Sequence, residues 1–318
     1  MKLAITGPLG HIGSRLIHEL TPADATEGVL IDNLSTQRYC SLFNLPEGVN
    51  WRFIEADVTK ADLEDLFGGA DVVIHLAAIT NAAESFAIAE EVERVNYFGA
   101  ERVALAAAKV CRPLIFLSTT SVYGVAGGTV AEDCGLEQLN PQSPYAKSKL
   151  EAERFIARLG ETSNLRFFIG RFGTIYGASS GMRFHTAVNK FVWQACVGQP
   201  LTVWRTALEQ KRPYLDLYDA VRALKFVVQR QLYDNQIYNV LTDNLTVRDI
   251  IEVIKRHVPQ VQVELVDARI MNQLSYTVDR SKFVSRGFKF EGDFERSVGE
   301  SIAKLKALTG QKCLQASR

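Results

Sequence analysis

Short apolar runs rich in isoleucine, valine, leucine and phenylalanine recur through the first half of this 318-residue chain. They occupy residues 2–6, 28–32, 51–55, 72–76, 114–118 and 167–171, with amphipathic stretches between them at 14–20, 63–67, 92–110 and 146–159. Strands that are apolar on both faces and alternate with helices form a parallel sheet covered on each side. The pattern therefore predicts an α/β fold built on a doubly wound parallel sheet.

The pattern changes beyond about residue 175. A loop and an aromatic-rich helix are expected within 177–200, a strand and a helix within 212–231, and helices at 245–257 and 294–308. The helix at 245–257 is expected to open at Thr246, with Asp249 in its first turn. We expect a first domain of residues 1–175, which segment 212–240 rejoins, and a smaller C-terminal lobe formed by the rest of residues 176–318.

Composition excludes several classes of protein. Lys plus Arg and Asp plus Glu both number 36, so the balanced charge predicts no nucleic-acid footprint and no basic membrane face. The five cysteines form no Cys-x-x-Cys pair, which predicts no metal site and no disulfide framework. The apolar run at the N-terminus is too short for a signal peptide, and no run approaches the roughly 18–20 residues of a membrane span. We expect a cytoplasmic protein with reduced thiols.

A glycine-rich turn follows the first predicted strand at residues 6–13 (Thr-Gly-Pro-Leu-Gly-His-Ile-Gly) and opens the first predicted helix. Its glycines permit a sharp turn and close approach to a pyrophosphate, and the helix N-terminus offers free N–H groups to phosphates. An ordinary tight turn would also fit the triplet alone. Asp32, at the end of the second strand, favours the first interpretation, because a carboxylate there binds an adenosine ribose. Together these features predict a Rossmann-type dinucleotide site.

The acidic residue also predicts which dinucleotide binds. Asp32 would repel a 2′-phosphate, and Asn33 beside it adds no positive charge, so NAD is favoured over NADP. Asp57 and Val58, after the third strand, could frame the adenine. Asp57 could equally be a helix cap.

Three further segments place polar groups where parallel sheets bind ligands, at the carboxyl ends of strands. They are residues 75–78 (His-Leu-Ala-Ala), 117–124 (Leu-Ser-Thr-Thr-Ser-Val-Tyr-Gly) and 144–149 (Pro-Tyr-Ala-Lys-Ser-Lys). Tyr145 and Lys149 are four residues apart and share a helix face. A nearby ammonium would lower the pKa of the Tyr145 phenol, as a general base requires. Alone, this common spacing fits a solvated helix face equally well.

With these motifs in order, the sequence resembles the extended short-chain dehydrogenase/reductases of the nucleotide-sugar epimerase/dehydratase type. Three further segments carry the resemblance: Val-Asn-Tyr-Phe-Gly at 95–99, Arg-Phe-Gly-Thr-Ile-Tyr-Gly at 171–177 and Gln-Lys-Arg-Pro-Tyr-Leu-Asp at 210–216. The resemblance implies that Tyr145 is the general base, that Lys149 orients the nicotinamide ribose, and that Thr119 hydrogen-bonds the reacting oxygen. It gives Asn96 a structural role. It also implies a nucleotide-diphosphate sugar as substrate, bound by the C-terminal lobe, and a homodimer through helices 91–110 and 146–159.

The residues after Thr119 bear on the reaction. Dehydratases of this family carry an Asp-Glu pair there, whereas this chain has Thr120 and Ser121, which cannot transfer protons as carboxylates do. Asp32 argues against a reductase that exchanges NADPH. We therefore expect a nucleotide-sugar epimerase that oxidises a sugar carbon, C4 by resemblance, and reduces it again. A dehydratase, decarboxylase or dehydrogenase, or a catalytically idle NAD-binding protein, remains the alternative.

Two departures from the family leave the substrate open. Thr174 stands where family epimerases often carry Asn, and Pro213 follows Arg212, the arginine expected to clamp the diphosphate. Arg212 could instead be a surface salt-bridge partner. Arg183, Asn189 and Lys190 could meet the nucleotide or lie on a solvated helix face, His185 could be a satisfied loop histidine, and Trp193 and Trp204 could be core contacts.

The expected site falls into three groups of residues. The catalytic residues are Thr119, Tyr145 and Lys149. The expected NAD-binding residues are Gly7, Gly10, His11, Ile12, Gly13, Asp32, Asn33, Asp57, Val58, Leu76, Ala77, Ala78, Ser118, Tyr145 and Lys149. The expected substrate-binding residues are Thr80, Thr120, Ser121, Thr174, Asn189 and Arg212. Ser118 is also expected to point away from Thr119, because side chains alternate along a strand.

Overall fold

The computed structural model describes residues 1–124, 128–267 and 275–306. A seven-stranded parallel sheet in the order β11-β7-β5-β4-β1-β2-β3 forms its centre. The strands are β1 (Lys2–Thr6), β2 (Glu27–Asp32), β3 (Asn50–Glu55), β4 (Val72–His75), β5 (Leu114–Thr119), β7 (Phe167–Phe172) and β11 (Gln236–Val240). The predicted Rossmann-type fold is thus confirmed, and the first six strands of this sheet along the chain end within one residue of the expected positions, whereas β11 was not predicted as a strand.

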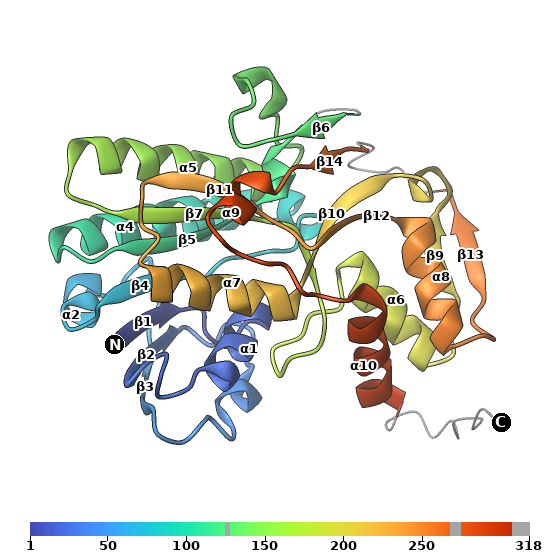
Figure 1. The fold of residues 1–318 in the computed structure, drawn as a ribbon, viewed down its shortest axis with the longest axis horizontal. Coiled ribbons are helices and arrows are strands. Elements are labelled where there is room, and N and C mark those ends of the chain that lie inside the picture. The colour runs from blue at the N-terminus through green and yellow to red at the C-terminus, as the bar shows by residue number, and fades with distance from the viewer. Residues whose placement is uncertain (125–127, 268–274, 307–318) are drawn as a thin grey trace.

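Helices cover both faces of this sheet (Figure 1). One face packs against α1 (His11–Glu19), α7 (Leu217–Arg230) and the short α9 (Ser281–Ser285). The other face packs against α2 (Leu63–Phe67), α4 (Gly99–Lys109) and α5 (Pro144–Thr162). Two separate apolar cores result, as expected for strands that are apolar on both sides.

The helix expected at 92–110 is built in three parts. It comprises α3 (Ala89–Glu93), a π-helical turn η3 (Arg94–Phe98) and α4. Asn96 lies in the π turn, fully buried, and both accepts a hydrogen bond from the Ile79 N–H and donates one to the Ile79 carbonyl, each at 2.8 Å. Asn96 thereby fixes the chain that follows β4, in keeping with its expected structural role.

The smaller lobe has its own sheets and its own core. A three-stranded sheet joins β8 (Thr174–Tyr176), β10 (Lys211–Asp216) and β12 (Asp243–Thr246), and a two-stranded sheet joins β9 (Leu201–Trp204) to β13 (Val263–Val266). The helices are α6 (Ala187–Cys196), α8 (Val247–His257) and α10 (Phe294–Lys306). Thr246 and Asp249 form a reciprocal capping box at the start of α8. The last two residues of the helix expected at 294–308 lie outside the described residues.

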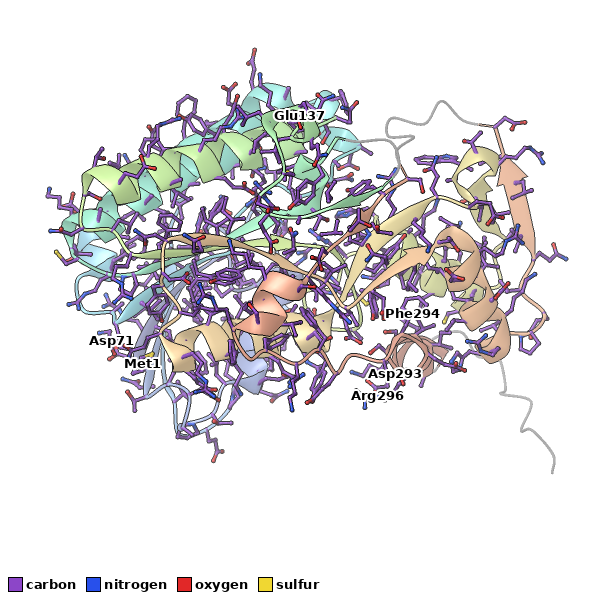
Figure 2. The ribbon with its side chains drawn as sticks, turned by 45° about the horizontal axis from the view of Figure 1, so that its top comes forward. Met1, Asp71, Glu137, Asp293, Phe294 and Arg296 are labelled. Carbon is purple, nitrogen blue, oxygen red and sulfur yellow. The ribbon has the colours of Figure 1, made fainter. Side chains whose placement is uncertain are left out.

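The chain crosses between the two parts more often than the sequence predicted. The strand of segment 212–240 belongs to the small sheet, because β10 pairs with β8 and β12, and only α7 and β11 join the large sheet. The chain also returns through β14 (Thr277–Val278), which pairs with β6 (Thr129–Val130), and through α9. It then re-enters the lobe at α10, where Asp293 accepts a hydrogen bond from the Arg296 N–H at 2.8 Å (Figure 2).

The remaining elements are short 3₁₀ turns. They are η1 (Tyr39–Leu42), η2 (Glu84–Phe86), η4 (Thr120–Val122), η5 (Leu136–Gln138) and η6 (Arg205–Ala207). Among the described residues, no helix combines the length and apolarity needed to cross a membrane.

Candidate active site

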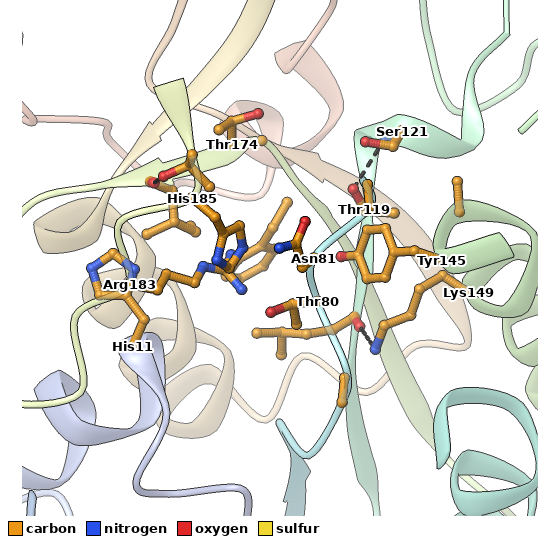
Figure 3. Close-up of a pocket in the computed structure, with 18 of the residues that line it drawn as sticks. His11, Thr80, Asn81, Thr119, Ser121, Tyr145, Lys149, Thr174, Arg183 and His185 are labelled. Atoms are coloured by element: carbon orange, nitrogen blue, oxygen red, sulfur yellow. Dashed lines mark hydrogen bonds between the residues drawn. The ribbon is translucent and has the colours of Figure 1, made fainter. Parts of the chain in front are cut away.

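A cavity of about 420 Å³ opens where the large sheet meets the lobe. One wall comes from the turn between β1 and α1, from the ends of β4 and β5, and from the first turns of α5. The opposite wall comes from β8, from the loop that precedes α6, and from β9 and β10. Figure 3 shows Thr119, Tyr145 and Lys149 on the first wall and Arg183 and His185 on the second. The cavity lies at the carboxyl ends of the strands, where α/β sheets bind ligands.

The glycine turn forms the floor of this cavity on the α1 side. Gly7 has a φ of +68°, and a Cβ atom there would lie 2.5 Å from the Ala77 backbone nitrogen. A Cβ on Gly13 would lie 2.6 Å from the Pro8 carbonyl oxygen. Only glycine fits these two positions. Gly10 lies at the N-cap of α1 without a side-chain cap, so the first N–H groups of the helix face the cavity.

Asp32 lies at the end of β2, beside the glycine turn. Its carboxylate accepts hydrogen bonds from the N–H groups of Leu9 at 3.3 Å and Leu34 at 3.0 Å. Burial raises the pKa of Asp32, while these two hydrogen bonds and the charge of Arg38 act in the opposite direction. The two bonds fix the orientation of the carboxylate.

Tyr145 and Lys149 project from the start of α5. Ser143 caps this helix by accepting a hydrogen bond from the Ala146 N–H at 3.2 Å, and a proline occupies the first turn. The side chains of Tyr145 and Thr119 lie near each other, and both line the cavity (Figure 3). The Lys149 ammonium donates to the Leu117 carbonyl oxygen at 2.8 Å. The three residues expected to be catalytic therefore meet on one wall of the cavity.

The charges around Tyr145 differ from the expected ones. Burial raises the pKa of its phenol, and the groups that oppose this rise are the Arg183 guanidinium and the Thr119 hydrogen bond, rather than Lys149. Burial also lowers the pKa of Lys149 to about 7, with a further lowering by Arg183 and an opposing effect of Glu153. The expectation that Lys149 lowers the pKa of Tyr145 is corrected for this structure, because Lys149 is itself desolvated and bonded to the strand.

Most of the expected ligand-binding residues line the cavity. These are Gly7, Gly10, His11, Ile12, Gly13, Leu76, Ala78, Thr80, Ser118, Thr119, Ser121, Tyr145, Lys149, Thr174 and Arg212. Ser118 lines it only with part of its surface, because its hydroxyl donates to buried Glu153 behind the wall. The expected opposite orientation of Ser118 and Thr119 is observed.

Two expected substrate residues point elsewhere. The Thr120 hydroxyl donates to the Phe172 carbonyl at 3.4 Å, because η4 turns this side chain into the protein. Asn189 is buried on α6, where it accepts from the Gly177 N–H at 3.3 Å and donates to the Arg183 carbonyl at 3.0 Å. Both side chains are occupied by backbone partners, so we assign neither to the substrate.

Five expected cofactor residues lie outside the cavity lining. Asn33 is exposed and accepts from the Ser35 N–H at 3.1 Å. Asp57 accepts from the N–H and hydroxyl of Thr59 within a turn, and it is not the helix cap that the sequence also allowed, because Asp62 caps α2. Of the other three, Asp32 and Ala77 lie beside the glycine turn, and Val58 is buried in the core next to α4.

Three residues that the sequence left undecided, Arg183, His185 and Trp204, complete the opposite wall. Arg38, between β2 and η1, also lines the cavity, and the sequence analysis did not identify it. The Arg183 Nε atom is buried and lacks a hydrogen-bond partner among the described residues, and its guanidinium acts on Tyr145. In the sequence, the only sign of this role was a positively charged residue shortly after the strand that ends at Tyr176. Where the Arg183 side chain points depends on how the loop after that strand packs.

That loop, residues 177–186, is fastened onto the glycine turn, and we call it the strap. The His11 ring nitrogen Nε2 donates to the Gly177 carbonyl at 2.7 Å, and the Gly181 N–H donates to the Ser14 hydroxyl at 2.9 Å. A Cβ on Gly181 would lie 2.3 Å from the Leu9 carbonyl oxygen. The strap therefore covers the start of α1 and carries Arg183 into the cavity.

Comparison with known proteins identifies the family. Residues 3–240 match the model of the NAD dependent epimerase/dehydratase family. This chain belongs to that family. Family membership makes it an NAD-dependent enzyme of the epimerase/dehydratase type, as the resemblance implied, and makes NAD its cofactor.

Individual relatives are distant. An uncharacterized UDP-glucose epimerase, YtcB of Bacillus subtilis, is 28% identical over 249 residues, which are 76% of each chain. A trifunctional UDP-glucose 4,6-dehydratase/UDP-4-keto-6-deoxy-D-glucose 3,5-epimerase/UDP-4-keto-L-rhamnose-reductase of Arabidopsis thaliana is 27% identical over 317 residues, 95% of this chain and 46% of that protein. The structure of UDP-glucuronic acid 4-epimerase from Bacillus cereus aligns with a TM-score of 0.86 at 23% identity, covering 97% of this chain and 100% of that one. At that identity the structural likeness establishes the shared fold.

The cavity of this family member fits NAD in two respects. The glycine positions at 7 and 13 and the N-terminus of α1, which has no side-chain cap, form a cradle that a pyrophosphate can approach closely. Lys149 is buried, makes no ion pair in the described part of the chain, and uses one hydrogen bond on Leu117. Two of its three N–H donors are therefore left for ribose hydroxyls.

Proposed function

We propose that this protein is an NAD-dependent nucleotide-sugar epimerase that inverts one sugar carbon, C4, by oxidation and reduction. The observation that carries the proposal is the placement of Tyr145, Thr119 and Lys149 together on the cavity wall beside the glycine turn. The similar proteins support it, because they include a UDP-glucose epimerase and a UDP-glucuronic acid 4-epimerase.

The cavity wall suits an anionic substrate. Every charged side chain that lines it within the described ranges is cationic or a histidine, and the arginines are Arg38, Arg183 and Arg212. Guanidinium groups bind phosphates with paired hydrogen bonds. We infer that these arginines hold the diphosphate of a nucleotide sugar, with the sugar directed toward Tyr145.

Tyr145 moves the proton in both halves of the proposed reaction. Bound NAD supplies a reversible two-electron oxidant next to the sugar. As the carbon becomes a ketone, Tyr145 in its phenolate form accepts the hydroxyl proton and becomes a phenol, and Thr119 would hold the same oxygen by a hydrogen bond. After the keto sugar turns its other face toward the cofactor, Tyr145 returns the proton as the ketone is reduced. Lys149 would hold the ribose of NAD with the two donors that it does not use on Leu117.

Epimerisation needs no acid or base besides Tyr145. The residues after Thr119 agree with this, because neither of them carries a carboxylate. Loss of water from the neighbouring carbon requires a proton donor and a proton acceptor. Here the two positions hold Thr120, bonded to the Phe172 carbonyl, and Ser121, which lines the cavity with a hydroxyl. These observations favour an epimerase over a dehydratase.

The proposal is tested with a panel of nucleotide sugars in deuterated buffer, followed by proton NMR. We expect one sugar to give its C4 epimer without deuterium on the ring carbons. A 4-keto-6-deoxy product, deuterium incorporation, or no turnover of any sugar would overturn the assignment.

Substitution of the proposed base provides the second test. Tyr145→Phe should lower turnover by about 10²–10⁴-fold, because it removes the group that moves the proton. Tyr218→Phe, on α7 outside the cavity lining, is the matched control and should keep the parent rate. Full activity of Tyr145→Phe would contradict the role of this residue.

A further inference from the structure

A buried ion pair lies directly behind the catalytic wall. Arg171 on β7 donates from Nη2 to a Glu153 carboxylate oxygen at 2.7 Å and from Nε to both oxygens at 3.1 Å, and both side chains are only 2% exposed. The Ser118 hydroxyl donates to the same carboxylate. Arg171 also donates from Nη1 to the Tyr123 hydroxyl at 2.9 Å. The Glu153 carboxylate thus accepts hydrogen bonds from both β5 and β7.

This carboxylate lies next to the proposed active site along α5. Glu153 follows Lys149 by four residues, so the two share one face of the helix. On that face Lys149 bonds to β5 at the Leu117 carbonyl, and Glu153 bonds to β5 at the Ser118 hydroxyl. Two successive attachments therefore fix α5 against β5, one and two turns beyond Tyr145.

We propose that Glu153 is a positioning residue of the active site: its carboxylate, held by Arg171, places a negative charge one helical turn from the buried Lys149 ammonium and fixes α5 on β5. The inference rests on the proposed role of Lys149 in holding NAD. Glu153 touches neither of the expected ligands and acts through Lys149.

The groups that face Lys149 support this role. On its own helix these are Tyr145 and Glu153, and from neighbouring elements His75 at the end of β4 and Arg183 on the strap. Burial and Arg183 lower the pKa of Lys149, and Glu153 is the group that raises it. Burial lowers the pKa of His75 to about 3, so that ring is neutral and adds no further positive charge beside Lys149. The charge of Lys149 at neutral pH therefore depends on Glu153.

The test measures NAD binding, without any sugar, as a function of pH. Protein freed of copurifying NAD is titrated with NAD by calorimetry at about pH 6 and about pH 8.5 for the parent, Glu153→Gln and Glu151→Gln. Glu151 is the matched control, because it lies two residues away on α5, half-exposed, near Lys147. In Glu153→Gln the dissociation constant for NAD at about pH 8.5, divided by that at about pH 6, should rise roughly tenfold for each unit by which the Lys149 pKa falls. Glu151→Gln should keep the parent ratio.

A second variant keeps the test decisive if the single substitution prevents folding. Glu153→Gln leaves the Arg171 guanidinium unpaired, whereas Glu153→Gln with Arg171→Met removes both charges. The double variant should show the same pH-dependent loss of NAD binding. A loss that is equal at both pH values, or no loss, would overturn the proposal. Because no sugar is present, this result is independent of whether the enzyme proves to be an epimerase.

Discussion

At the scale of single residues, the surroundings of a side chain decide its chemistry. The four-residue spacing of Tyr145 and Lys149 is common in helices. Their assignment to an active site depends on Thr119 and the glycine turn, which line the same cavity. The charge on Lys149 is in turn set by burial, by Arg183 on the strap and by Glu153 behind the cavity wall. Buried titratable groups of this kind link the active site to the stability of the fold.

His75 gives a prediction for acid stability. It is fully buried, bonded through Nδ1 to the Thr6 hydroxyl at 2.7 Å, and burial lowers its pKa from 6.5 to about 3. Below pH 6.5, His75 binds a proton in the unfolded chain but stays neutral in the folded state. The contribution of His75 should therefore lower the free energy of unfolding by up to about 1.4 kcal/mol per pH unit. Above pH 6.5 this contribution is absent.

Urea unfolding at about pH 6.5 and about pH 5 measures the effect. His75→Asn should lose less stability on acidification than the parent does. Equal slopes for the parent and His75→Asn would contradict the prediction.

At the scale of elements, the strap and α5 form the two sides of the site. The N-cap Ser143 and the bonds to β5 hold α5 in place, so Tyr145 presents its hydroxyl to Thr119. The strap is held by contacts with α1, among which the close approach of Gly181 leaves no room for a side chain. Because the strap covers the start of α1, we expect it to retain the pyrophosphate of NAD.

Gly181→Val tests this retention. The new side chain would collide with backbone oxygens of Leu9 and Gly10, at 2.3 and 2.5 Å from its Cβ, and should lift the strap. We expect NAD to bind at least roughly tenfold more weakly, a loss of about 1.4 kcal/mol, measured by calorimetry. Gly69→Val is the control, because a Cβ there meets only the flexible end of Lys2. Unchanged affinity in Gly181→Val would show that the strap does not retain NAD.

At the scale of the whole molecule, the chain passes several times between the large sheet and the lobe, and these crossings connect the two parts. Segments after residue 172 alternate between the two, so β11 and α9 join the large sheet while β10 and α10 join the lobe. One face of the assembly remains apolar on its surface. Phe98 and Leu105 are each 47% exposed and seven residues apart, so they lie on the same face of the helix formed by η3 and α4.

This apolar face suggests the homodimer that the resemblance implied. We propose that the helices over residues 91–110 and 146–159 pair with those of a second copy. Light scattering should give twice the mass of one chain, and Leu105→Asp should give a monomer, because it places a charge in the interface. Val284→Asp, at a 45% exposed position on α9, should remain dimeric. A parent protein that is monomeric at all concentrations would contradict the prediction.

The sequence by itself determined the features that depend on neighbours along the chain. Apolar runs predicted the first six strands of the large sheet to within a residue at each end, and the Thr246 capping box marked the start of α8. The glycine turn and the four-residue spacing of Tyr145 and Lys149 have the same local origin. Each of these signals needs only the geometry of one strand, one turn or one helix.

Only the tertiary structure decided which side chains share the cavity. Thr120 and Asn189 had suitable chemistry, but their backbones turn them toward protein partners. Arg183 lines the cavity because the strap docks through Gly181 on a turn about 170 residues earlier in the chain. The strand expected to rejoin the large sheet pairs with β8 and β12 instead. These outcomes depend on packing between segments far apart in sequence, where no local pattern records which surfaces will meet.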